Sequence, residues 1–328
     1  MGGNLYKLGR LPKADYLKVE QKIRLYLDEK VAGNYRIPRY YGNKEDFGDV
    51  DIILLSDALP KEWETLRMEI VEDLGVTQYQ STGSVFSTVF DNFQVDYFLR
   101  SKQNFESTYA YLSFNDIGNL IGKIYKRFNL KYGEHGLSYV FRRADGHYKK
   151  DIPITNDFKK IFEFLDLEYA QWERGFRTRE DMFKWVIASP YFSVKPYRKK
   201  DKSLQKREKE RATMRYFMQF LEENNIQKAY NYLENRDEYL PQIAAYFQPT
   251  NLIQRIQEER TREEYVSVIK TKYNGRIVMQ LFPSLQGKKL GRFMNGFEQD
   301  LGNHEEVLYQ KSAEEIIGLL KDYYRRFN

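Results

Sequence analysis

The sequence lacks cysteine altogether and holds only three histidines, His135, His147 and His304. The absence of cysteine excludes disulfides, thiolate nucleophiles and cysteine-ligated zinc sites. Three histidines offer little material for a histidine metal site or a Ser-His triad. No run of about 18 apolar residues is present, which excludes a transmembrane helix. The first residues also lack the apolar segment of a secretory signal, so we expect a cytoplasmic protein with no membrane partner.

The remaining composition is that of a globular protein with a mild excess of positive charge. The chain has 328 residues, which suggests about two domains. Hydrophobic residues make up 41% and charged residues 30%, so disorder is not expected. The 53 Lys and Arg residues against 47 Asp and Glu residues give a net charge of +6. This balance permits a nucleic-acid partner without requiring one.

Two halves of the chain differ in their expected secondary structure. Up to about residue 150, strands alternate with helices. The expected helices span 14–28, 60–74 and 116–128, and the expected strands span 49–55, 84–90, 93–99 and 136–142. Asp91-Asn92, between two β-rich runs, predicts a hairpin. From about residue 155 we expect helices, among them 204–223, 226–236 and 251–273, with capping boxes at Thr178–Asp181 and Ser312–Glu315. We therefore predict an α+β fold with domains at 1–150 and 151–328.

Three aspartates give the strongest chemical signal. Asp49 and Asp51 lie at the start of the 49–55 strand, just before its continuous apolar run Ile52–Leu55. Residues two apart on a strand project to one side, about 6.5–7 Å apart. Asp96 lies within the apolar strand 93–99, where an unpaired charge is costly. If these strands are neighbours, three carboxylates converge and supply the oxygen ligands that Mg²⁺ prefers. A lone Asp-x-Asp is commonly a solvated strand end, but Asp96 and the preceding glycine-containing loop favour a metal site that supports two-metal phosphoryl transfer.

This pattern resembles the nucleotidyltransferase superfamily typified by DNA polymerase beta and the CCA-adding enzymes. The resemblance implies a small mixed sheet with flanking helices, followed by an all-helical C-terminal domain. It also implies that Asp49 and Asp51 bind two magnesium ions, and that Asp96 completes the site of the ion that activates the attacking hydroxyl.

The family's Gly-Ser motif would fall on Gly42-Asn43, whose backbone would approach the nucleotide phosphates. Asn43 replaces the usual serine, and only Lys44 to Gly48 separate the pair from Asp49. Contact with the phosphates could come instead from Lys44 or from the backbone around Gly48.

Two further features are open to a functional or a structural interpretation. Gly287-Lys-Lys-Leu-Gly291, within Phe282–Phe297, resembles the helical tail of bacterial-type CCA-adding enzymes, and an ordinary loop-to-helix junction explains it almost as well. Together with the aspartates it is similar to uncharacterised nucleotidyltransferases of phage genomes.

The segment 195–211 is strongly basic and flanked by aromatic residues, which suits RNA, although such runs are usually solvated helix faces. The RNA-binding candidates within it are Arg198, Lys199, Lys200, Lys206 and Arg207. A smaller cationic cluster, at Arg174, Arg177 and Arg179, suits a triphosphate, RNA or a plain surface role.

The function expected from the residues and the resemblance together is magnesium-dependent, template-independent nucleotidyl transfer. The RNA 3′-hydroxyl, plausibly of a tRNA-like acceptor, would attack a nucleoside triphosphate and release pyrophosphate. Two alternatives stay open. The acceptor could be a protein or a small molecule, or the product a nucleotide second messenger. The chain could also be a catalytically degenerate RNA-binding protein on the same scaffold.

Overall fold

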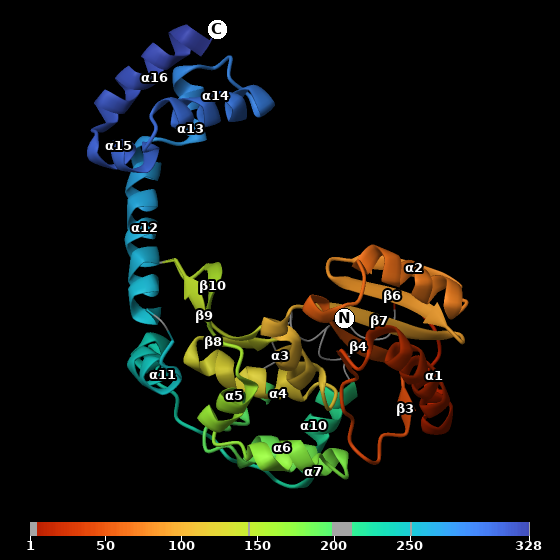
Figure 1. Cartoon of the computed structure of the whole chain (residues 1–328). Coiled ribbons are helices and arrows are strands. Elements are labelled where there is room, and N and C mark those ends of the chain that lie inside the picture. Colours follow the sequence, from red (N-terminus) through yellow and green to blue (C-terminus); the bar gives the residue numbers. More distant parts are fainter. Residues whose placement is uncertain (1–4, 144, 199–211, 250, 328) are drawn as a thin grey trace. The chain divides into compact units, whose positions relative to one another are not determined.

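The computed structural model of the chain describes residues 5–143, 145–198, 212–249 and 251–327. It is a mixed α+β structure, as expected, with most of the later elements helical (Figure 1). The chain forms two compact units, the first built from Met1–Val140 with Lys150–Thr250 and the second from Phe141–Lys149 with Asn251–Asn328. Helices that follow residue 155 therefore share a unit with the aspartate-bearing strands. The predicted functional division near residue 150 stays a prediction.

The central sheet of the first unit holds five strands in the order β2-β4-β7-β6-β5. Their bounds are β2 Tyr35–Arg36, β4 Asp49–Leu55, β5 Gln78–Thr82, β6 Val85–Phe90 and β7 Phe93–Arg100. β4 and β7 pair in parallel, and the other pairs are antiparallel. Asp91 and Asn92 both have positive φ, 49° and 56°, as the two central residues of a type I′ hairpin turn require. The predicted hairpin is confirmed.

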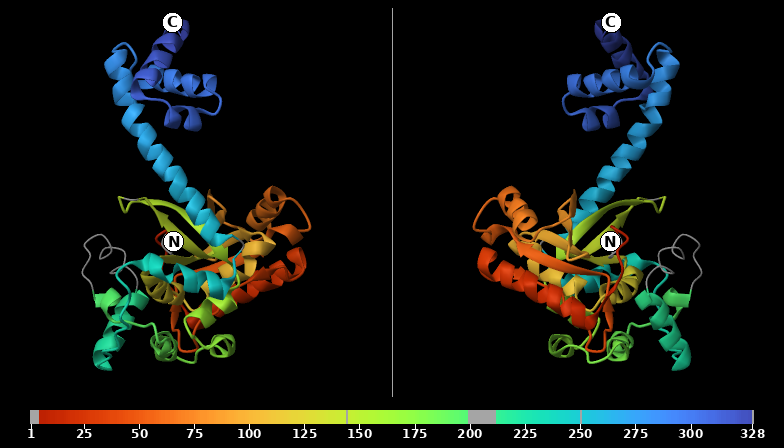
Figure 2. Two further views of the ribbon diagram at one scale, coloured as in Figure 1. Left: turned by 90° about the vertical axis from the view of Figure 1, so that its left-hand side faces the viewer. Right: turned by 90° about the vertical axis from the view of Figure 1, so that its right-hand side faces the viewer.

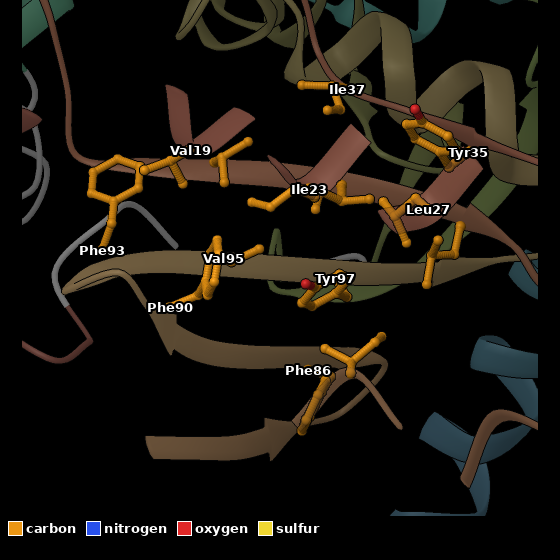
Figure 3. Close-up of a cluster of buried hydrophobic side chains, with 14 of the residues drawn as sticks. Val19, Ile23, Leu27, Tyr35, Ile37, Phe86, Phe90, Phe93, Val95 and Tyr97 are labelled. Carbon is orange, nitrogen blue, oxygen red and sulfur yellow. The ribbon is translucent and has the colours of Figure 1, made fainter. Parts of the chain in front are cut away.

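The two faces of this sheet are covered differently. Alternate residues of β4 and β7, Ile52, Leu54, Val95 and Tyr97 among them, enter the main hydrophobic cluster under α1 (Lys13–Val31) and α2 (Trp63–Asp73). Figure 3 shows part of this cluster. On the opposite face, α3 (Lys102–Leu112) covers a smaller cluster of Ile53, Phe98 and Phe105. Since alternate residues share a face, Asp49, Asp51 and Asp96 lie on the α3 side of the sheet.

The rest of the first unit consists of short elements around a second sheet of order β10-β9-β8. Its strands are β8 Leu130–Gly133, β9 Gly136–Arg142 and β10 Tyr148–Thr155, and β1 Leu11–Pro12 pairs separately with β3 Asp46–Phe47. The helices are α4 Ile117–Tyr125, α5 Phe158–Phe164, α6 Tyr169–Arg174, α7 Arg179–Ala188, α8 Lys195–Arg198, α10 Ala212–Glu223 and α11 Leu240–Phe247. The capping box at the start of α7 is present, as predicted.

The second unit is helical apart from the hairpin tip that it takes from β9 and β10. Its helices are α12 Leu252–Lys272, α13 Gly275–Leu281, α14 Gly287–Asp300, α15 His304–Gln310 and α16 Ala313–Phe327. The four shorter helices gather around one end of α12 (Figures 1 and 2). Phe293, Phe297, Ile316 and Leu320 form the centre of its hydrophobic core. Among the residues that the structure describes, no helix is both long and apolar enough to span a bilayer.

One expected helix is wrong. Residues 226–235 are irregular, and only a short 3₁₀ turn, Arg236–Tyr239, follows them. The backbone of this segment bonds to a distant stretch instead of to itself, because Tyr230 N donates to Phe192 O (3.2 Å) and Val194 N donates to Lys228 O (3.0 Å). A helical periodicity in the sequence cannot reveal such a tertiary pairing.

Candidate metal centre

The parallel pairing of β4 with β7 brings the three aspartates together. In this register Asp51 lies opposite Asp96, and Asp49 lies opposite Gln94. One carboxylate oxygen from each of Asp49, Asp51 and Asp96 can be chosen so that all three atoms lie within 4.8 Å of one another. The sequence predicted that the three carboxylates converge if the two strands are neighbours. The strands are neighbours, and the carboxylates converge.

The electrostatics of this cluster favour a bound cation. Burial raises the pKa of Asp51 well above its ordinary value, and repulsion from Asp49 and Asp96 raises it further. Burial also raises the pKa of Asp96, although hydrogen bonds from Ser87 and Gln94 oppose the rise. The Oδ1 atoms of both Asp51 and Asp96 are buried and meet no hydrogen-bond donor in the described part of the chain. Closely spaced carboxylate oxygens, two of which lack a hydrogen bond from any described residue, are suitable ligands for a Mg²⁺ ion.

Lys44 is a cation at the edge of the cluster. Its ammonium donates to Asn115 Oδ1 (3.2 Å) and lies 4.0 Å from the centre of the Phe47 ring. Burial lowers the pKa of Lys44 to about 8, although the charges of Asp49 and Asp51 act in the opposite direction. Lys44 is therefore charged at neutral pH and close enough to interact electrostatically with both aspartates.

Gly42 and Asn43 have a structural role that differs from the one expected for their backbone. Gly42 N donates to Phe176 O and Asn43 N donates to Arg177 O, each at 2.9 Å. A Cβ atom at position 42 would lie 2.7 Å from Arg177 O, so glycine is needed for this close backbone approach. Because both amides are already bonded within the chain, they are not available to phosphate oxygens. Gly48 is buried between β3 and β4.

The arginine cluster predicted at 174–179 divides between two environments. Arg179 N donates to Asn43 Oδ1 (3.1 Å), and the Arg179 guanidinium stacks 3.7 Å from the centre of the Tyr216 ring. Arg177 is exposed beside the same loop. Arg174 instead forms an exposed ion pair with Glu168. The structure thus brings Arg177 and Arg179, but not Arg174, to the loop that precedes β4.

Gln94 is the residue of this site that sequence reasoning missed. It is buried, its Nε2 donates to Asp96 Oδ2 (2.9 Å), and its Oε1 accepts a hydrogen bond from Leu5 N (3.1 Å). The backbone of Leu5 therefore fixes the orientation of the amide, and the amide fixes the carboxylate. One sequence signal was available, because Gln94 is a polar residue two positions before Asp96 and so shares its face of the strand.

The proposed RNA-binding residues are largely outside the described residues. Lys199, Lys200, Lys206 and Arg207 fall in the interval 199–211, and Arg198 is the last residue of α8. Their proposed role stays a prediction. Comparison of the chain with models of known protein families gives no match, and comparison with curated proteins gives none either.

We predict that Asp51→Asn raises the unfolding temperature of the metal-free protein. Since the folded state favours the protonated carboxyl, the stability that Asp51 contributes is present at low pH and is lost as the pH rises through its raised pKa. Asparagine at this position carries no charge at any pH and avoids this cost. A gain on the order of 1 kcal/mol corresponds to roughly 2–4 °C for a domain of this size. The measurement is thermal unfolding in EDTA and in millimolar Mg²⁺.

Mg²⁺ should raise the unfolding temperature of the wild type and leave that of Asp51→Asn unchanged. The matched control is Asp15→Asn, which removes an exposed partner of Lys18 on α1 and should retain the Mg²⁺ response. A wild type that does not respond to Mg²⁺ would contradict the metal centre.

We predict that Gln94→Leu weakens Mg²⁺ binding about 10–100-fold, the usual effect of removing a side chain that orients a metal ligand. The leucine fills the buried volume but cannot donate to Asp96, so the carboxylate loses its fixed orientation. The measurement is the Mg²⁺ concentration that gives half of the thermal shift, with the exposed Gln78→Leu on β5 as control. Equal Mg²⁺ affinities in the wild type and Gln94→Leu would show that the amide does not orient Asp96.

Proposed function

We propose that the protein is a magnesium-dependent nucleotidyltransferase that adds a nucleotide from a nucleoside triphosphate to the 3′-hydroxyl of an RNA. The observation that carries this proposal is the convergence of Asp49, Asp51 and Asp96, with two carboxylates on β4 and the third on the adjacent β7. The same order along the chain underlies the resemblance to the polymerase beta-like superfamily. The mixed sheet, with α1 and α2 packed on one face and the acids on the other, is consistent with the fold that the resemblance implies.

The three carboxylates would hold two magnesium ions. When bound, the ions supply positive charge that makes the attacking hydroxyl more acidic and neutralises the departing pyrophosphate. In the transfer, a bond forms between the RNA 3′-oxygen and the α-phosphorus, while the bond from that phosphorus to pyrophosphate breaks. The contribution of the protein is mainly positioning, and Gln94 serves it by holding Asp96 Oδ2, while Oδ1 is buried and receives no hydrogen bond from any described residue.

Lys44 is the side chain best suited to meet the triphosphate. It lies between the Gly42-Asn43 turn and β4, it is charged at neutral pH, and its field reaches Asp49 and Asp51. The amides of Gly42 and Asn43 are engaged with Phe176 and Arg177, so a side-chain cation must take the place of the backbone contact that the family uses. Arg179, which is attached to the same turn through Asn43, adds positive charge there.

We predict that purified protein transfers label to RNA when it is incubated with Mg²⁺, total tRNA and each of the four labelled triphosphates in turn. Asp51→Asn and Asp96→Asn should abolish the transfer, because each removes a proposed metal ligand, and Asp15→Asn should retain it. A denaturing gel gives the result and identifies the base. Release of pyrophosphate without labelled RNA would refute RNA as the acceptor, and the absence of any turnover would refute the enzyme.

We predict that Lys44→Gln raises the KM for the triphosphate by about 10–100-fold, the range for losing one hydrogen bond to a charged group. Burial lowers the pKa of Lys44 from its ordinary value to about 8, so the positive charge of Lys44 is lost as the pH rises through about 8. The KM of the wild type should therefore rise above this pH, whereas the KM of Lys44→Gln should stay flat. Lys18→Gln, on the exposed face of α1, is the control. A parallel rise in both enzymes would refute the role of Lys44.

A further inference from the structure

The first unit contains a cavity that the proposed chemistry does not use. Its volume is about 210 Å³, several times the roughly 30 Å³ that a water molecule occupies in the liquid. Three segments form it: the 3₁₀ turn after α4 (Lys126–Phe128), residues 193–196 at the start of α8, and the irregular segment near residue 230. The side chains that define its chemistry are Arg127, Lys195, Tyr230, Asn231 and Tyr232.

The cavity exists because residues 226–235 are not helical. Ser193 forms an isolated bridge with Ala229, and Tyr230 N donates to Phe192 O, so the chain runs extended beside the approach to α8. The hydroxyl of Tyr232 donates to Tyr191 O, which holds the ring at the cavity wall. The Tyr230 and Tyr232 rings pack edge to face with their centres 4.8 Å apart.

Among the residues that the structure describes, the charged side chains that line the cavity are all positive. Arg127 and Lys195 line it, and no acidic side chain from the described part of the chain does so. The Arg127 guanidinium lies over the Tyr232 ring, 5.1 Å from its centre, and the Arg127 Nε is buried with no hydrogen-bond acceptor among residues whose placement is described. A buried N–H without an acceptor carries a free-energy cost, and an anion that enters the cavity would remove it.

We propose that this cavity binds a phosphate group of a single-stranded RNA. Arg127 and Lys195 neutralise the phosphate, and the half-buried Tyr230 ring offers a face on which the adjoining base stacks. A cationic cavity with tyrosine walls suits a phosphate joined to a nucleoside better than a free phosphate, which would leave the rings without a stacking partner. The identity of the bound strand as the acceptor rests on the proposed function, but RNA binding at this cavity does not.

The test measures fluorescence anisotropy of a labelled single-stranded RNA of mixed sequence. It is done in EDTA without triphosphate, so that no transfer occurs, and over a range of salt concentrations. For Lys195→Gln we expect binding to weaken about 10-fold at low salt. Each lost phosphate contact should lower the slope of log Kd against log salt by about 1. We expect this decrease in slope for both Lys195→Gln and Arg127→Gln.

Tyr230→Leu should weaken binding about 10-fold without changing the salt dependence, because stacking releases no counterions. Lys18→Gln on α1 is the matched control for a cation outside the cavity and should bind as the wild type does. If Arg127→Gln fails to fold, the exposed Lys195→Gln and Tyr230→Leu still decide the question. If inorganic phosphate displaces the RNA no better than another salt at equal ionic strength, the result supports the proposal. If inorganic phosphate binds the protein and RNA does not, the result overturns it.

Failure of this proposal is distinguishable from failure of the proposed function. Asp51→Asn should bind RNA normally while it transfers nothing. If Lys195→Gln and Tyr230→Leu both bind RNA as the wild type does, the cavity is not an RNA site, even where nucleotide transfer is present. If they lose RNA binding while the wild type transfers no nucleotide, the cavity proposal stands without the enzyme.

Discussion

The parallel register between β4 and β7 is the constraint on which the site depends. It places Asp51 opposite Asp96, and a shift of one residue would turn Asp96 into the hydrophobic cluster under α1 and α2. That cluster opposes the shift, because Val95 and Tyr97 occupy it fully buried. The turn at Asp91 and Asn92 fixes β7 against β6 in addition. The position of the carboxylates is thus determined by apolar side chains on the opposite face of the same strands.

The stability gained from that packing supports a local arrangement that is unfavourable by itself. Three carboxylates share one small region, and the buried Oδ1 atoms of Asp51 and Asp96 receive no hydrogen bond from any described residue. The chain satisfies Asp96 only in part, through hydrogen bonds from Gln94 and Ser87. Sites that bind a charged ligand commonly retain such unsatisfied groups, because satisfying them within the protein would remove the reason for the ligand to bind.

The features predicted from the sequence are those encoded by short-range periodicity. Strand 49–55 follows from a continuous apolar run, the hairpin from Asp91-Asn92 between two β-rich runs, and the common face of Asp49 and Asp51 from the two-residue repeat of a strand. The structure has all three. The role of Gln94 depends on Leu5, 89 positions away along the chain, and the need for glycine at position 42 depends on the carbonyl of Arg177. The helix expected at 226–236 was wrong for the same reason, since a tertiary pairing replaces it. Contacts between distant segments leave no periodic signal.

The aspartate cluster and the cavity carry opposite charges, and the proposed RNA substrate would need both. Phosphates of an RNA strand are repelled by the clustered aspartates unless divalent cations neutralise them, so the carboxylates alone cannot hold the strand. The strand must therefore be held by positive charge elsewhere on the protein, while only its terminal hydroxyl reaches the acids. Arg127 and Lys195 supply such charge on the same unit, and no described acidic side chain lines the cavity to compete for it. Under the proposed function, this separation of the RNA-binding charge from the carboxylates would let the three aspartates stay close enough together to hold magnesium.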